Sequence, residues 1–165
     1  MKTEKITRLA LLTAVALILF VVELQIPLPI PIAGVKLGLS NIVTLIAVYR
    51  FGGKDAALIL TARVLLGSLI GGNPTALLYS FTGAVFCMTA MLLLKRAVPE
   101  RFLWLNSLIG AVFHNLGQLS AAALLLGSLS VFAYLPILTA AGGIAGVFTG
   151  ICASLLLRRF PTGKE

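Results

Sequence analysis

Charged residues are scarce in this sequence, and acidic residues are the scarcest. Charged residues make up 11% of the 165 residues, whereas hydrophobic residues make up 59%. The mean hydropathy is +1.08. Soluble domains carry about 25% charged residues, so this composition excludes an ordinary soluble domain. It indicates a protein that is embedded in a lipid bilayer.

Residues that ligate metals or form disulfides are equally few. His114 is the only histidine, and Cys87 and Cys152 are the only cysteines. Both cysteines fall inside apolar runs, where a lone thiol behaves as a small apolar group and predicts neither a disulfide nor a metal site. A zinc site needs more such ligands than this sequence supplies. We therefore expect no metal and no cofactor.

What the sequence does contain is a series of apolar runs. A helix needs about 20 residues to cross a hydrocarbon layer of about 30 Å. The second and third runs are short, which predicts tilting, local thinning of the bilayer or exposure to a water-filled cavity. The first run lacks a small-x-small cleavage site, so we interpret it as a retained span. We predict an all-α integral membrane protein with one transmembrane domain over 1–165, a bundle of six helices near 7–26, 38–51, 55–71, 75–95, 103–126 and 136–157.

Basic residues are distributed unevenly between these runs. With the N-terminus in the cytoplasm, one basic residue, Lys36, falls on the outer side and one, Arg63, lies within a run. This distribution predicts that both termini are cytoplasmic. It also explains the net charge of +8 without a nucleic-acid partner, which needs basic residues gathered into a stripe or motif. The eleven residues expected on the inner side are Lys2, Lys5, Arg8, Arg50, Lys54, Lys95, Arg96, Arg101, Arg158, Arg159 and Lys164.

Small residues recur at four-residue spacing in several runs. In lipid, such rows allow the backbones of two helices to approach closely. For the sixth run we favour packing inside the bundle, and for the first run both internal packing and docking to another membrane subunit remain open. The rows are Ala10 and Ala14 in the first run, Gly67 and Gly71 in the third, and Gly142, Gly146, Gly150 and Ser154 in the sixth.

The segment between the first and second runs, "ELQIPLPIPIAGVKLGLSN" at 23–41, differs from the rest. Pro27, Pro29 and Pro31 exclude a helix and favour an extended path. Ser40 or Asn41 is expected to cap the second helix. The segment is either a plain connection or a lid over an outward-facing cavity, and we favour the lid because the other connections are so short.

Arg63 is the most unusual of the polar residues at membrane depth. It has no acidic residue within four positions on either side. A charge in such a setting costs several kcal/mol unless it is paired or hydrated. If the third helix starts at Asp55, Arg63 lies about 12 Å along it, near the middle of the bilayer. Two explanations remain open: Arg63 pairs with Glu23, or it binds an anionic ligand through its bidentate fork.

Other polar residues are predicted to converge with Arg63 in the outer half of the bundle. The fifth run, "LNSLIGAVFHNLGQL" at 105–119, places His114 and Gln118 on one helix face because they are four residues apart. Ionisable residues inside a membrane usually mark ligand or ion pathways. Tyr79 and Phe81 are candidates for an aromatic wall, although such residues are more often plain packing. The predicted substrate-binding residues are Glu23, Lys36, Asn41, Arg63, Tyr79, His114, Asn115 and Gln118.

The pattern as a whole resembles the substrate-binding S components of energy-coupling factor (ECF) transporters. Six short spans, the Ala10 and Ala14 pair and a proline-rich first outer loop carry this likeness. More specifically, "KLGLSNIVTLIAVYRFGG" at 36–53, the third run with its arginine and "HNLGQL" at 114–119 are similar to the Gx transporter family. Members of that family are often labelled heptaprenyl diphosphate synthase component I.

The resemblance implies a multi-pass subunit of the bacterial cytoplasmic membrane that binds a small organic solute from outside. Arg63 and Lys36 favour an anionic solute. Its implied partners are a transmembrane T component, which Ala10 and Ala14 would contact, and two ATPase subunits. The first outer loop would act as a gate. A third class of function, a scaffold without a ligand, predicts that the polar residues pair entirely with one another.

The synthase label implies a rival function, that of a membrane accessory subunit in prenyl diphosphate or quinone synthesis. Enzymes that elongate prenyl chains hold magnesium and diphosphate through two aspartate-rich motifs, because each metal needs several carboxylate oxygens. Asp55 is the only aspartate here. The string "FGGKD" at 51–55 also lacks the glycine spacing and the hydroxyl residue of an ATP-binding loop. We therefore expect that the chain is not an enzyme and has no catalytic residues.

Overall fold

Helices account for nearly all of the described chain. The computed structural model describes residues 2–26, 38–71 and 74–159, and over these residues it contains no strand. The predicted all-α class and the predicted number of helices are confirmed. The helices are α1 (Lys2–Leu24), α2 (Asn41–Phe51), α3 (Gly53–Gly71), α4 (Pro74–Lys95), α5 (Leu103–Leu126) and α6 (Leu135–Arg159), with short 3-10 helices η1 (Glu100–Phe102) and η2 (Leu129–Tyr134).

Two helix starts differ from the prediction by three residues or more, and the other boundaries differ by two residues at most. The first helix begins at Lys2 rather than at residue 7, so its basic start is helical as well. The second begins at Asn41 rather than at residue 38. Gly38 has a φ of +82°, a left-handed conformation that a helix does not contain and that glycine adopts at little cost.

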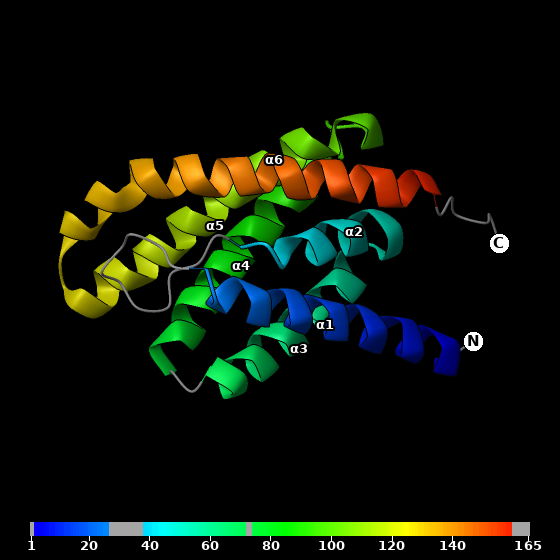
Figure 1. Cartoon of the computed structure of the whole chain (residues 1–165), viewed down its shortest axis with the longest axis horizontal. Helices are drawn as coiled ribbons and strands as arrows, with labels where there is room; N and C mark the ends of the chain where they lie inside the picture. The colour runs from blue at the N-terminus through cyan, green and yellow to red at the C-terminus, as the bar shows by residue number, and fades with distance from the viewer. Residues whose placement is uncertain (1, 27–37, 72–73, 160–165) are drawn as a thin grey trace.

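The chain passes back and forth between two ends of the bundle. Figure 1 shows that α1 begins and α6 finishes at the same end, where the α2–α3 and α4–α5 connections also lie. The α5–α6 connection lies at the opposite end. This alternation agrees with an even number of passages. The cytoplasmic placement of the termini stays a prediction.

At the end where the termini lie, basic residues form ion pairs and hydrogen bonds between helices. Lys5 on α1 forms an ion pair with Asp55 on α3 at 2.8 Å. The Lys95 Nζ donates to the carbonyl of Val48, 2.7 Å away, which ties α4 to α2. Lys5 and Lys95, which contribute to the predicted orientation in the membrane, therefore also link neighbouring helices.

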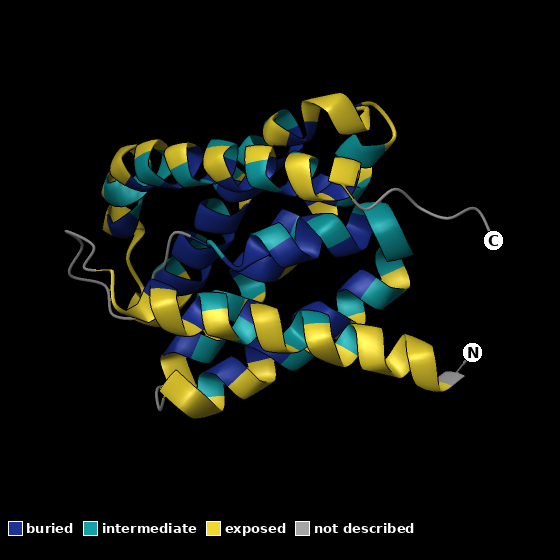
Figure 2. Cartoon of the chain, turned by 45° about the vertical axis from the view of Figure 1, so that its right-hand side comes forward, coloured by how far each residue is buried: buried dark blue, intermediate teal, exposed yellow. Residues whose placement is uncertain are grey.

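The short helix α2 lies at the centre of the bundle. It contacts all five of the other long helices, and Figure 2 shows it surrounded by them, with the exposed surface on α1 and the outer faces of the other helices. Its 11 residues span about 16 Å, half of a hydrocarbon layer. Its first turn therefore begins inside the bundle rather than at a membrane surface.

The other helices are longer, and most are apolar enough to cross a bilayer. Among the described residues, α1, α4, α5 and α6 are the four helices with sufficient length and apolar composition. The helix α3 has 19 residues but carries three charged ones, Lys54, Asp55 and Arg63. The chain thus has the composition of a multi-pass membrane protein, with α2 short and α3 charged.

Glycines allow α4, α5 and α6 to pack most closely of all the helices. A Cβ atom on Gly117 of α5 would lie 2.7 Å from the carbonyl oxygen of Thr82 on α4. On α6, Gly142, Gly146 and Gly150 all face α5 at comparably short distances. The row predicted in the sixth run therefore serves packing inside the bundle. Close backbone approach replaces the hydrophobic effect, which does not drive helices together in lipid.

The topology predicts opposite accessibility for two exposed residues. In a variant without Cys87 and Cys152, we expect Leu129→Cys in η2 to react with a membrane-impermeant maleimide added to intact cells. Arg101→Cys in η1 is expected to react only after the cells are opened, because the two 3-10 helices lie at opposite ends of the bundle. Mass spectrometry of the labelled protein measures both. Labelling of position 101 but not of position 129 in intact cells would contradict the predicted orientation.

Candidate anion-binding site

Arg63 lies in the middle of α3 and points into the bundle. Its side chain is only 4% exposed. One guanidinium nitrogen, Nη1, donates a hydrogen bond to the hydroxyl of Ser40. The other two nitrogens, Nε and Nη2, are buried and find no hydrogen-bond partner among the residues that the structure describes. These two nitrogens form one edge of the guanidinium fork, the edge that binds carboxylates and phosphates in a bidentate manner.

Ser40 is the residue that immediately precedes α2. The sequence predicts that Ser40 or Asn41 caps this helix, but the Ser40 side chain makes no capping hydrogen bond and accepts from Arg63 instead. The first turn is closed by backbone bonds, such as that from the Asn41 N–H to the Gly38 carbonyl at 2.9 Å. The cap is thus made by the backbone, which leaves the hydroxyl to orient the guanidinium.

Glu23, near the end of α1, reaches the same place. Its side chain is 4% exposed, and its Oε1 accepts a hydrogen bond from the backbone N–H of Gly38. It also lies close enough to Arg63 for a favourable electrostatic interaction. Glu23, Gly38, Ser40 and Arg63 therefore connect the end of α1, the start of α2 and the middle of α3.

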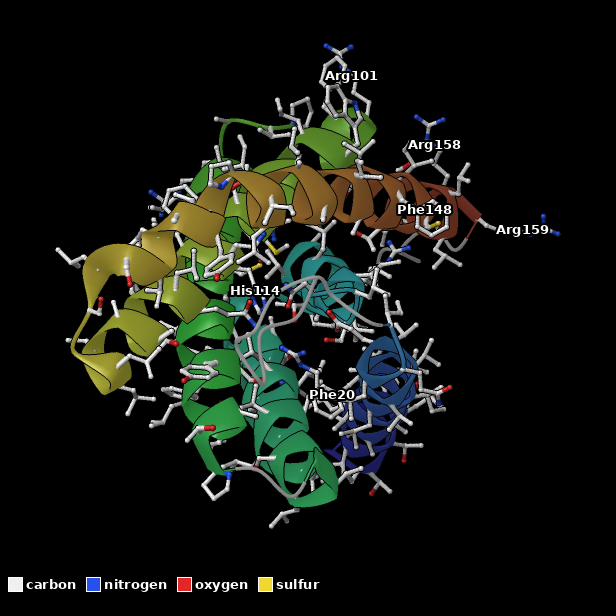
Figure 3. All side chains as sticks on the ribbon, turned by 60° about the vertical axis from the view of Figure 1, so that its left-hand side comes forward. Phe20, Arg101, His114, Phe148, Arg158 and Arg159 are labelled. Atoms are coloured by element: carbon white, nitrogen blue, oxygen red, sulfur yellow. The ribbon has the colours of Figure 1, made fainter. Side chains whose placement is uncertain are left out.

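His114 and Gln118 complete this group from α5. Both are buried, and both lie against Gly83 of α4, where a Cβ atom would sit 2.8 Å from the Cγ of Gln118 and 3.0 Å from the Cε1 of His114. A Cβ on Gly38 would lie 3.1 Å from the Cδ2 of the same imidazole. Figure 3 shows His114 in the interior of the bundle. The two residues predicted to share a helix face therefore both lie against α4, and His114 also lies near the start of α2.

Asn41 borders the site at the first residue of α2. It is 5% exposed, and neither atom of its side-chain amide has a hydrogen-bond partner among the described residues. Its amide nitrogen would lie 2.5 Å from a Cβ atom on Gly38. We call the residues gathered here the polar cluster: Glu23, Ser40, Asn41, Arg63, His114 and Gln118.

The remaining predicted site residues lie elsewhere or outside the described residues. The side-chain amide of Asn115 donates to the carbonyl of Leu138 at 2.7 Å, so this residue faces α6. Tyr79 packs in an apolar cluster that includes Leu119 and Leu138. Phe81 is 44% exposed. Lys36 belongs to 27–37, as do the three prolines of the expected lid, and that segment lies outside the described residues.

Sequence reasoning assigned no site role to Gly38, Ser40 or Gly83. Gly38 contributes a backbone N–H and a positive φ, and Gly83 contributes the space that His114 and Gln118 occupy. The hydroxyl of Ser40 was visible in the sequence next to Asn41 but was interpreted as a helix cap. The residue type alone does not indicate any of these roles.

A comparison with known protein families shows to which family this chain belongs. Its residues 12–156 match the family described as heptaprenyl diphosphate synthase component I. The chain belongs to the heptaprenyl diphosphate synthase component I family. This confirms the resemblance drawn from the strings at 36–53 and 114–119.

The match covers the polar cluster and all six long helices, apart from the start of α1 and the end of α6. The family description denotes one component, which implies a larger complex. No curated protein and no solved structure matches the chain.

Proposed function

We propose that this chain is the substrate-binding membrane subunit of an ECF-type transporter in the bacterial cytoplasmic membrane. In this proposal it adopts an S-component-like fold and takes up a small, anionic organic solute from outside. The observation that carries the proposal is the edge of Arg63, a pair of buried N–H donors without a partner among the described residues. Buried donors are almost always satisfied, and an exception that faces a group of polar residues is best explained by a ligand.

The surroundings of Arg63 support an anion at this place. The α2 helix starts beside it, and the N-terminal end of a helix carries a partial positive charge that stabilises anions. The hydroxyl of Ser40 holds one side of the guanidinium, which pre-orients the opposite edge for a bidentate contact. Asn41 and Gln118 add amide groups that donate and accept hydrogen bonds.

The outer face of α1 supports docking to a second membrane subunit. Ala10 and Ala14 are both exposed, so they do not serve packing inside this bundle. Ala10 lies in the half of α1 nearer its start, Ala14 lies at its middle, and Glu23 lies near the other end. Such a pair allows close approach of another helix, which we assign to a T component. Two ATPase subunits would supply the energy, since "FGGKD" is no ATP-binding loop.

Enlarging the small-residue pair tests this assignment. We expect Ala10→Leu or Ala14→Leu to reduce association with the T component about tenfold or more, because the added bulk separates the two helix backbones. Folding and anion binding are expected to stay intact, since neither alanine contacts the polar cluster. Pull-down of co-expressed T and ATPase subunits measures the association. Ala133→Leu changes another exposed alanine, in η2, and is the control. Undiminished association of the α1 variants would disprove the docking role.

The family description favours a second function. As an accessory subunit in prenyl diphosphate or quinone synthesis, the chain would hold a polyprenyl diphosphate made by another protein, with its phosphates at Arg63. Both functions place an anion at the same arginine. They differ in the partner that co-purifies, which is a T component in the first case and a soluble prenyl synthase in the second.

A further inference from the structure

Only two charged side chains are buried among the described residues, and they lie close together. Arg63 and Glu23 are both 4% exposed and interact electrostatically. Their charges are opposite, so the pair has almost no net charge before a ligand arrives. Ser40, Asn41 and Gln118 carry no charge.

Glu23 is held in place by the backbone. Its carboxylate accepts the Gly38 N–H, and Gly38 in turn lies against Asn41 and the imidazole of His114. The negative charge of Glu23 therefore stays beside the guanidinium. It neutralises the positive charge while the Nε and Nη2 edge remains available to a ligand.

We infer that the negative charge of Glu23 limits how much negative charge a bound ligand can carry, which we call the charge limit. The ligand is therefore an organic monocarboxylate rather than a phosphate or diphosphate. This inference rests on the proposed function and narrows its substrate class. A carboxylate matches the two parallel donors of the Arg63 edge in shape. With Glu23 present, it brings one negative charge to a neutral pair.

A diphosphate fits the same site poorly because of its charge. It carries about two or three negative charges near neutral pH, and like charges placed together in a low-dielectric site repel strongly. Arg63 and Glu23 offset each other, and no further buried cation among the described residues compensates the charges of a diphosphate.

Anion titrations of the purified protein in detergent test the charge limit. At about pH 8 and constant ionic strength, we expect acetate to raise the unfolding temperature of the wild type saturably, and pyrophosphate to have little effect. Glu23→Gln keeps a carbonyl that accepts the Gly38 N–H but removes the charge, so its affinity for pyrophosphate is expected to rise about tenfold or more. Glu4→Gln, which removes an exposed acid of the same helix, should leave both titrations unchanged.

Two results would overturn the inference. In the first, the wild type binds pyrophosphate as tightly as it binds acetate. This measurement uses the wild type alone, so it stays informative even if the Glu23→Gln protein does not fold. The other is no gain of pyrophosphate binding in a folded Glu23→Gln protein. A failure of the transporter role shows up differently, as a missing T component in pull-downs, while the preference for acetate over pyrophosphate remains.

Discussion

Replacing Arg63 with methionine is expected to abolish anion binding, with a loss of affinity of about 100-fold or more. The substitution keeps the length and apolar stem of the side chain but deletes both free donors of the guanidinium edge. Charge-assisted bidentate contacts are among the strongest that a protein offers to an anion. Acetate titration followed by thermal unfolding measures the effect, and so does mass spectrometry of the solutes that co-purify with each protein.

The stability of the same variant separates binding from a structural role. If Arg63 serves a ligand, Arg63→Met should lower the thermal stability little or even raise it, because a buried charge with unsatisfied donors is removed. If Arg63 is mainly the structural partner of Glu23, the variant leaves a buried carboxylate unpaired and destabilises the protein by about 3–5 kcal/mol.

A double-mutant cycle decides between these two roles. The proteins compared are the wild type, Arg63→Met, Glu23→Gln and the double variant, all measured by thermal unfolding in detergent. Loss of acetate binding in Arg63→Met, with only a modest coupling between the two substitutions, supports the ligand role. Strong rescue of stability in the double variant, together with unchanged acetate binding in Arg63→Met, would show that Arg63 is a structural partner.

Replacing Gly150 with alanine is expected to destabilise the bundle by about 2–3 kcal/mol, the upper part of the range for an overpacked core. Its Cβ would lie 2.4 Å from the Cα of Trp104 and 2.8 Å from the Cβ of Ser107. Because one of these atoms belongs to the α5 backbone, no side-chain rotation relieves the clash and the two helices must separate. This separation also breaks the 3.0 Å hydrogen bond between Ser107 and Thr149.

Gly71 provides the matched control for this substitution. A Cβ atom there meets nothing within 4 Å, so Gly71→Ala is expected to be neutral or to stabilise α3 by up to about 1 kcal/mol through its helix propensity. Unfolding of both variants in mixed detergent micelles measures the difference. Equal stability of the two variants would contradict the close α5–α6 packing described above.

The polar cluster was predictable only in part. The depth of Arg63, Glu23, His114 and Gln118 followed from counting residues along apolar runs, and the structure brings these four together. The sequence also suggested Asn115 and Tyr79, which the structure places against α6 and in an apolar cluster. Depth depends on position along one helix, whereas the face that a residue presents depends on the neighbouring helices.

By itself, the sequence determined the helical class, the position of the six helices and the basic end of the bundle. Each of these depends on local composition: apolar runs form helices, glycine and charged residues interrupt them, and lysine and arginine gather between them. The contact of Arg63 with Ser40, that of Glu23 with Gly38 and the central place of α2 were decided only by the tertiary structure. The physical reason is that a helix apolar on all sides has no amphipathic pattern to mark its inner face, so glycine-mediated packing selects that face.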